Sequence, residues 1–89
     1  MKDMANEKHT INGKLAKAAR MSAAEKLDPK YGDKAITFAE DFYLSVHTQR
    51  ARECGRDNLS LASRNFYLIV EEEPELVKEI LDRKLAPKP

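Results

Sequence analysis

The longest stretch of this sequence with helical periodicity is residues 33–54, DKAITFAEDFYLSVHTQRAREC. Apolar side chains recur at steps of three and four residues from Ala35 to Val46, which predicts one long amphipathic helix. Its first half carries the aromatic residues Phe42 and Tyr43, whereas residues 47–53 are mostly polar and basic. A helix of this kind contributes to the core at one end and meets solvent or a partner at the other. We therefore expect the rest of the chain to pack against residues 33–54.

Shorter helices are predicted on both sides of this stretch. Thr10 can cap a first helix and Ser60 can cap a third, because their hydroxyl groups accept hydrogen bonds from free backbone amides. Pro74 suits the first position of a last helix. Breaks are expected at residues 27–32 and at Gly55, which should end the long helix in the left-handed conformation.

The start of the long helix can be placed in two ways. We favour Asp33 as its cap. In the alternative, Asp28 is the cap and Pro29 takes the first helical position, which lengthens the helix. Both versions give the same fold class, an all-α compact bundle of about four helices around a long central helix.

The length of the chain limits how it can be stabilised. Eighty-nine residues make one domain at most, expected to span residues 10–85 between disordered ends at 1–9 and 86–89. Such a chain buries only roughly 60% of its unfolded surface, so its core is thin. With Cys54 as the only cysteine and two histidines, neither an internal disulfide nor a four-ligand zinc site is available. No metal or cofactor is therefore expected, and association with another protein chain remains open.

The charge and hydropathy of the chain bear on its partners and location. Its net charge of +1 weakens the case for non-specific binding of nucleic acid. No apolar run approaches the length of a membrane span, and the start of the chain, MKDMANEKHT, lacks the apolar core of a signal peptide. We expect a cytoplasmic, reducing location and no membrane partner.

Residues suited to catalysis do not form a set. Glu40, Asp41 and His47 lie on one predicted helix, whereas acid–base chemistry needs groups that converge from separate elements. Cys54 has basic neighbours but lies at a helix C-terminus, where the dipole opposes a thiolate, so a half-buried structural cysteine is expected. No nucleotide-binding glycine pattern occurs in the sequence. The sequence therefore predicts a protein without enzymatic activity.

The basic end of the long helix loosely resembles a helix-turn-helix unit. Ala51, Gly55 and Leu61 supply a small residue for close packing, a glycine for the turn and an apolar residue beyond it. Residues 60–65 would then enter the major groove, where arginine and asparagine bind the edges of guanine and adenine. Two features oppose this interpretation. Acidic residues 71–73 would repel phosphates, and Arg56 takes a position that is normally apolar in helix-turn-helix units. The candidate contact residues are Arg50, Arg52, Arg56, Arg64 and Asn65.

A broader pattern covers residues 14–70, as a short helix, a long helix, a short extended segment and a further helix. It is carried by Leu27-Asp28, by AEDF at residues 39–42 with Ser45-Val46, and by RDNLSLA at residues 56–62. This succession resembles the histone-fold subunits of general transcription factor complexes. The resemblance implies an obligate handshake dimer without catalytic activity.

The last predicted helix carries a stripe of Leu76, Ile80 and Leu81, which is either core or an exposed face for a partner helix. Together these patterns predict a small non-catalytic interaction or regulatory module that forms homo- or hetero-oligomers through its helices. Such a module could belong to a nucleic-acid-associated assembly. The alternative is a helix-turn-helix-like regulator that reads DNA with residues 60–65.

Overall fold

Helix is the regular secondary structure of the described chain. The computed structural model describes residues 4–55 and 59–86, with side chains from residue 13 onward. No strand occurs within those ranges, and the all-α prediction is confirmed. The described residues form six helices rather than about four: α1 (Met4–Lys26), α2 (Lys30–Asp33), α3 (Ala35–Asp41), α4 (Val46–Glu53), α5 (Leu61–Glu72) and α6 (Pro74–Leu85). No helix in the described ranges is both long and apolar enough to cross a membrane.

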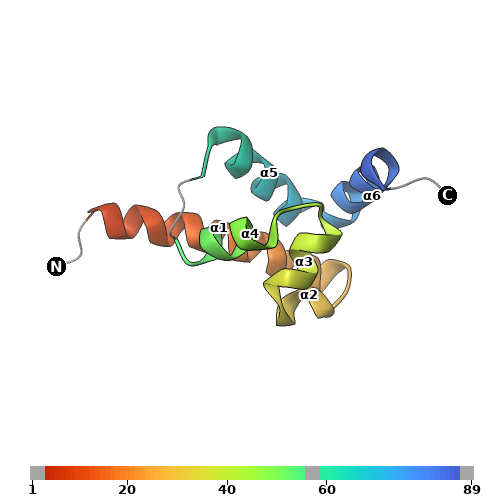
Figure 1. Ribbon diagram of the computed structural model, residues 1–89, viewed down its shortest axis with the longest axis horizontal. Helices are drawn as coiled ribbons and strands as arrows, with labels where there is room; N and C mark the ends of the chain where they lie inside the picture. Colours follow the sequence, from red (N-terminus) through yellow and green to blue (C-terminus); the bar gives the residue numbers. More distant parts are fainter. Residues whose placement is uncertain (1–3, 56–58, 87–89) are drawn as a thin grey trace.

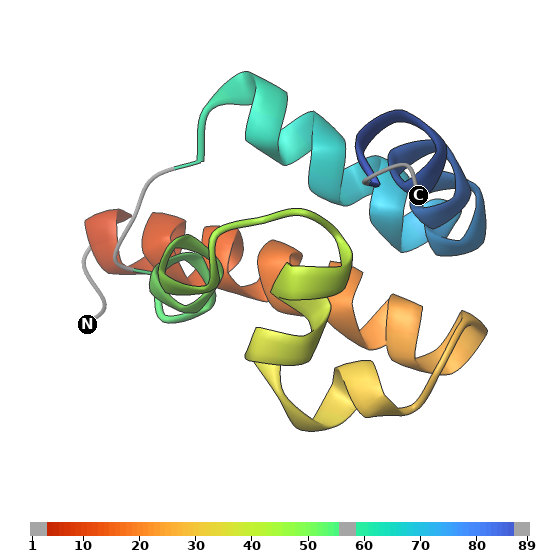
Figure 2. The same ribbon diagram turned by 45° about the vertical axis from the view of Figure 1, so that its right-hand side comes forward.

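The helix at the centre of the fold is α1, and the predicted central role of residues 33–54 is wrong. α1 contacts each of the other helices (Figure 1). It runs through the middle of the molecule, with α5 on one side and α2 and α3 on the other (Figure 2). Ala16, Ala19 and Ala23 are fully buried, and their small side chains let neighbouring helices approach closely. α1 begins at Met4, ahead of the predicted cap at Thr10.

The predicted long helix is divided into α3 and α4 by a turn at residues 42–45. Tyr43 has a φ of 60°, in the left-handed region. Its backbone N–H donates to the Glu40 carbonyl at 3.3 Å, and that of Leu44 donates to the Ala39 carbonyl at 2.8 Å. These two bonds form a Schellman motif, which satisfies the last carbonyls of α3 and reverses the chain. Figure 2 accordingly shows α4 nearly end-on while α3 lies across the view.

The turn follows a cluster of buried aromatic rings. Phe38 and Phe42 are stacked with ring centroids 4.6 Å apart, and the Tyr31 ring meets Phe42 edge-on at 5.8 Å. Both phenylalanines are almost completely buried. The Tyr43 side chain, beyond the turn, donates a hydrogen bond to Asp82 of α6 at 2.8 Å. The break therefore directs consecutive aromatic residues to different places, one into the core and one onto α6.

The first break also differs from the prediction. Residues 30–33 form the short helix α2, which leads through extended Lys34 into α3. Lys34, not Asp33, is the residue before α3, and no side chain caps that helix. Asp28 accepts a hydrogen bond from the backbone of Lys30 at 3.0 Å, so its side chain stabilises the turn into α2.

Several local predictions are confirmed. The Ser60 hydroxyl accepts a hydrogen bond from the backbone of Ser63 at 3.1 Å and caps α5. Gly55 follows α4 with a φ of 75°, and Pro74 begins α6. Ser45 caps α4 in the same way as Ser60 caps α5, which the sequence pattern did not predict. The three confirmed features each depend on a few neighbouring residues, whereas the path of the chain depends on contacts between residues far apart in the sequence.

Gly13 lies where α1 passes close to the end of α4, and this contact leads to a test of the fold. A Cβ atom added at Gly13 would lie 2.7 Å from the backbone oxygen of Glu53. Alanine usually stabilises a helix by about 1 kcal/mol relative to glycine. Here we expect Gly13→Ala to lower the free energy of unfolding by about 1–3 kcal/mol, because backbone must move to admit the methyl group.

Urea denaturation followed by circular dichroism measures this effect, with Gly32→Ala as the matched control. A Cβ at Gly32 would lie 3.2 Å from the Ala24 side chain and 3.7 Å from the end of the flexible Met21 side chain. We expect the control to change stability by less than about 1 kcal/mol. A Gly13→Ala protein more stable than the wild type would contradict the close approach of α1 and α4.

Candidate functional site

The candidate contact residues for DNA or a partner do not form one surface. Arg50 is exposed on α4, and Arg64 and Asn65 are exposed on α5. Arg52 is half-buried between these helices, and Arg56 lies outside the described residues. α4 packs against α1 and α3, whereas α5 packs against α1 and α6. The two helices of the predicted helix-turn-helix unit therefore pack on α1 more than on each other.

The Arg52 side chain connects α4 to α5 inside the protein. Its guanidinium group donates to the Tyr67 hydroxyl at 3.1 Å and to the Ser63 hydroxyl at 3.2 Å. The Tyr67 hydroxyl in turn donates to the side-chain oxygen of buried Gln49. Burial raises the pKa of Tyr67, although the hydrogen bond from Arg52 acts in the opposite direction. Tyr67 thus stays protonated as the donor to Gln49, and Arg52 is occupied by internal hydrogen bonds.

A more deeply buried arginine, Arg20 of α1, joins three parts of the chain. Two of its nitrogen atoms donate to the two carboxylate oxygens of Glu53, each at 2.8 Å. Its third nitrogen donates to the backbone carbonyls of Tyr31 at 3.0 Å and Gly32 at 2.9 Å. Gln49 donates a further hydrogen bond to Glu53 at 2.8 Å. All the hydrogen-bonding nitrogens of this guanidinium group are therefore used to hold α4 and α2 on α1.

The surroundings of Glu53 keep it charged. Burial raises the pKa of the Glu53 carboxyl, but hydrogen bonds from Arg20 and Gln49 and the positive charges of Arg20 and Lys17 lower it by more. Its pKa consequently lies below the ordinary value. The resulting ion pair is structural, since both of its side chains are largely inaccessible to solvent, with exposed fractions of 9% and 12%.

The outward side of α5 carries three exposed large aliphatic residues. Leu61 is 74% exposed, Leu68 is 48% exposed and Ile69 is 56% exposed. Exposed polar residues lie on the same side of the helix, at spacings of three and four residues from these aliphatic residues. We call this set the α5 outward face, and its members are Leu61, Arg64, Asn65, Leu68, Ile69 and Glu72.

The sequence did not reveal this face. Residues 66–70 are apolar around the whole helix, so their pattern alone does not say which side is buried. The buried side is the one that carries Tyr67 and Val70, with Phe66 packed partly against the core. Leu61 and Ile69, which are as apolar as the buried residues, are on the other side. The available signal was the spacing of the polar residues Arg64 and Asn65, which places them on the same side of a helix as Leu61 and Leu68.

The stripe predicted on α6 is split between surface and core. Leu76 is 50% exposed and Ile80 is 38% exposed, and they lie one helical turn apart. Leu81 is half-buried and packs against the core cluster. Leu76 and Ile80 therefore remain candidates for contact with a partner, whereas Leu81 holds α6 to its own chain.

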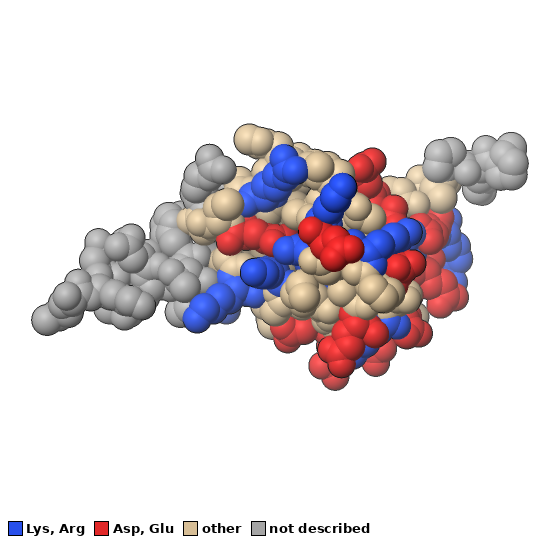
Figure 3. Space-filling view, turned by 90° about the horizontal axis from the view of Figure 1, so that it is seen from below, with Lys and Arg blue, Asp and Glu red and all other residues tan. Residues whose placement is uncertain are grey.

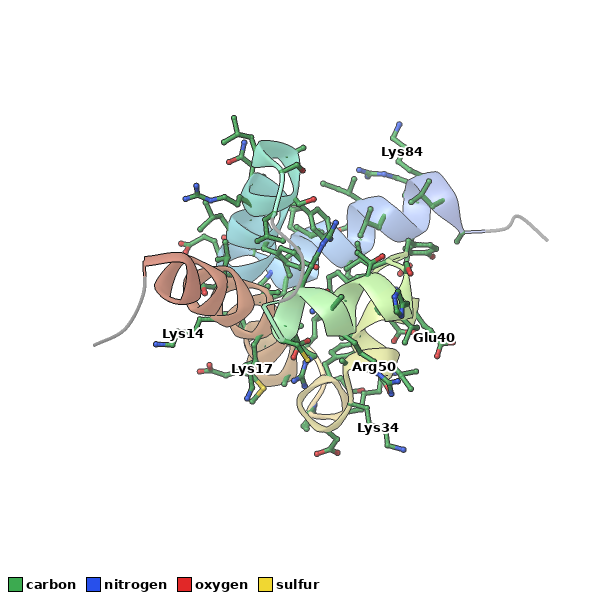
Figure 4. All side chains as sticks on the ribbon, turned by 60° about the vertical axis from the view of Figure 1, so that its left-hand side comes forward. Lys14, Lys17, Lys34, Glu40, Arg50 and Lys84 are labelled. Atoms are coloured by element: carbon green, nitrogen blue, oxygen red, sulfur yellow. The ribbon has the colours of Figure 1, made fainter. Side chains whose placement is uncertain are left out.

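On the face shown in Figure 3, basic residues are dispersed among acidic ones rather than gathered. Figure 4 shows Lys14 and Lys17 on α1, Arg50 on α4 and Lys34 just before α3, with the acidic Glu40 nearby. In the view of Figure 3, acidic and basic side chains alternate across the face. Nucleic-acid-binding surfaces usually present a continuous basic patch. The face in Figure 3 has no such continuous patch.

Candidate catalytic residues are not brought together either. His47 and Cys54 are both exposed on α4 or at its end, so the expected half-buried position of Cys54 is wrong. Within the described ranges, no three His, Cys, Asp or Glu side chains are grouped so that they could hold a metal ion. The exposed α5 outward face is consequently the feature on which a functional proposal can be built.

Comparison of the chain with protein-family models, with curated proteins and with solved structures found no match. The resemblance to histone-fold subunits therefore stays a prediction.

Proposed function

We propose that this chain is a small, non-catalytic association module that binds another protein chain through the α5 outward face, assisted by Leu76 and Ile80 of α6. The observation that carries the proposal is the exposure of Leu61, Leu68 and Ile69 on one side of one helix. Single exposed aliphatic residues are common on protein surfaces, but grouped ones mark interaction sites.

The chemistry of this face suits a helical partner. Its aliphatic residues recur at helical spacing, as in helices that bind a groove or another helix. Arg64 lies toward one end of the face and Glu72 lies at the other, so the apolar residues have charged neighbours. An apolar centre with a polar rim is typical of protein interfaces. A role in protein association also agrees with the resemblance to the histone-fold subunits.

DNA binding by residues 60–65 has less support. Arg64 and Asn65 are exposed as that function requires, but Leu61, Leu68 and Ile69 share their side of α5. Large aliphatic side chains displace water from the phosphates without offering them a hydrogen-bond donor, which is unfavourable for the charged phosphates. Arg52, a further candidate for contact with DNA, is engaged with Tyr67 and Ser63. Protein association is therefore the function that we propose.

The proposal is tested by the size of the native complex in an extract of the source cell. We expect the wild-type chain to elute from a size-exclusion column in a complex larger than one chain. Leu68→Asp should elute as a single chain, because a carboxylate in an apolar interface costs at least about 2 kcal/mol unless it is paired. Detection by an antibody against the chain gives the elution volume in each case.

Met21→Asp is the matched control, since Met21 of α1 is an apolar residue with 45% exposure outside the α5 outward face. It should elute with the wild-type complex. Circular dichroism of both purified variants shows whether they remain folded. Elution of the wild-type chain as a single chain, or an unchanged complex with folded Leu68→Asp, would refute the proposed function.

A further inference from the structure

The charges of the α5 outward face are arranged symmetrically about Leu68. Arg64 precedes Leu68 by four residues and Glu72 follows it by four, and all three side chains are exposed. At a rise of about 1.5 Å per residue, the two charges lie about 12 Å apart along the helix axis with the leucine midway. From residue 64 to residue 72 the face therefore has a basic end, an apolar centre at Leu68 and an acidic end.

We infer that the α5 outward face binds a second copy of this chain, with the two α5 helices antiparallel and a two-fold axis passing near Leu68. This inference rests on the proposed function and specifies its partner. In this arrangement Arg64 of each copy faces Glu72 of the other copy, so the same ion pair forms twice. Leu68 packs against Leu68 at the centre.

The antiparallel arrangement follows from the charges. A parallel pair would place Arg64 against Arg64 and Glu72 against Glu72, and like charges that face each other are unfavourable. A two-fold axis pairs a surface with itself, which requires a surface that is complementary to its own reversed copy. The order Arg64, Leu68, Glu72 meets that requirement.

The ends of α5 also have suitable partners in this arrangement. Leu61 lies seven residues before Leu68, so it reaches the level of the α5–α6 junction of the other copy. That junction is followed by the half-exposed Leu76. Leu61 is the most exposed of the large apolar residues that the structure describes, and this contact would cover it. The contact also enlarges an interface that a single pair of short helices would leave small.

Sedimentation equilibrium of the purified chain at low ionic strength tests the inference. We expect the mass of two chains at high protein concentration and a dissociation to single chains on dilution. Arg64→Glu and Glu72→Arg should each raise the dissociation constant by about tenfold or more, because each places like charges together twice. Both residues are exposed, so these variants should keep the wild-type circular dichroism spectrum.

The double variant Arg64→Glu, Glu72→Arg is the decisive control. It restores both ion pairs with reversed polarity, so its dissociation constant should return to within about threefold of the wild-type value. A parallel dimer would not show this behaviour, since its like charges face each other in the wild type and in each single variant. An asymmetric contact with another part of the chain would show no rescue.

Failure of this inference can be told apart from failure of the proposed function. A purified chain that is monomeric at all concentrations would overturn self-association, and so would a dimer insensitive to the single charge reversals. If that chain still elutes in a larger complex from a cell extract, and Leu68→Asp removes it, the association function stands with a different partner. If the complex is absent as well, both are refuted.

Discussion

Arg20→Met is expected to lower the free energy of unfolding by about 3–5 kcal/mol, the usual cost of removing one partner of a buried ion pair. The variant leaves the Glu53 carboxylate largely buried with Gln49 as its remaining hydrogen-bond donor. It also leaves the carbonyl groups of Tyr31 and Gly32 without the Arg20 hydrogen bonds. Methionine retains most of the length of the arginine side chain, so the loss comes from charge and hydrogen bonding. Urea denaturation followed by circular dichroism gives the value.

The matched control for this variant is Lys30→Met. It removes an ion pair between Lys30 and Asp41 whose side chains are 52% and 34% exposed. Exposed pairs of this kind contribute about 0–1 kcal/mol. If the two variants lowered the free energy of unfolding equally, burial would not strengthen the contribution of Arg20 to stability. In the double variant Arg20→Met, Glu53→Met, we expect less destabilisation than the sum of the single effects, since no unpaired charge is left.

Phe42→Ala is expected to cost about 3–5 kcal/mol of the free energy of unfolding. The Phe42 side chain is 1% exposed and contacts the rings of Phe38 and Tyr31. Small domains often have stabilities of only about 5 kcal/mol, so this variant should be largely unfolded near room temperature. A weak helical signal in circular dichroism, without a cooperative thermal transition, would confirm the prediction.

Phe42→Leu keeps the prediction testable if the alanine variant does not fold at all. Leucine fills part of the same volume, and we expect a smaller loss of about 1–2 kcal/mol. Tyr43→Ala provides the comparison at the next position, where the side chain is 40% exposed. A Phe42→Ala protein as stable as Tyr43→Ala would contradict the division of these neighbouring residues between core and surface.

The division of residues 33–54 shows what the sequence could predict and what it could not. The apolar spacing from Ala35 to Val46 continues across the break, so periodicity gives no sign of it. The left-handed residue is Tyr43, whereas the usual signal for such a turn is glycine or asparagine. Ser45 is the one local sign of the break, because a serine can cap a helix that begins at the next residue. The prediction of an all-α fold is nevertheless correct, because α3 and α4 are both helices.

The candidate site was less predictable than the fold class. The sequence places Arg50 and Arg52 two residues apart, but one reaches solvent and the other reaches Tyr67 on the next helix of the chain. Leu61 and Ile69 are as apolar as buried residues, and their exposure depends on which side of α5 packs on α1. Tertiary packing decides both the direction of these arginine side chains and the exposure of these apolar residues. A single sequence gives little information on tertiary packing.

The alanine-lined α1 also has a consequence for biosynthesis. The helix that touches all the others precedes them in the sequence, so the ribosome releases it before its partners exist. Ala16, Ala19 and Ala23 expose only methyl groups at this stage, and a surface with so little apolar area offers little to misfolding contacts. We therefore expect α1 to carry a low risk of aggregation during the time before Phe38, Phe42 and Tyr67 are synthesised.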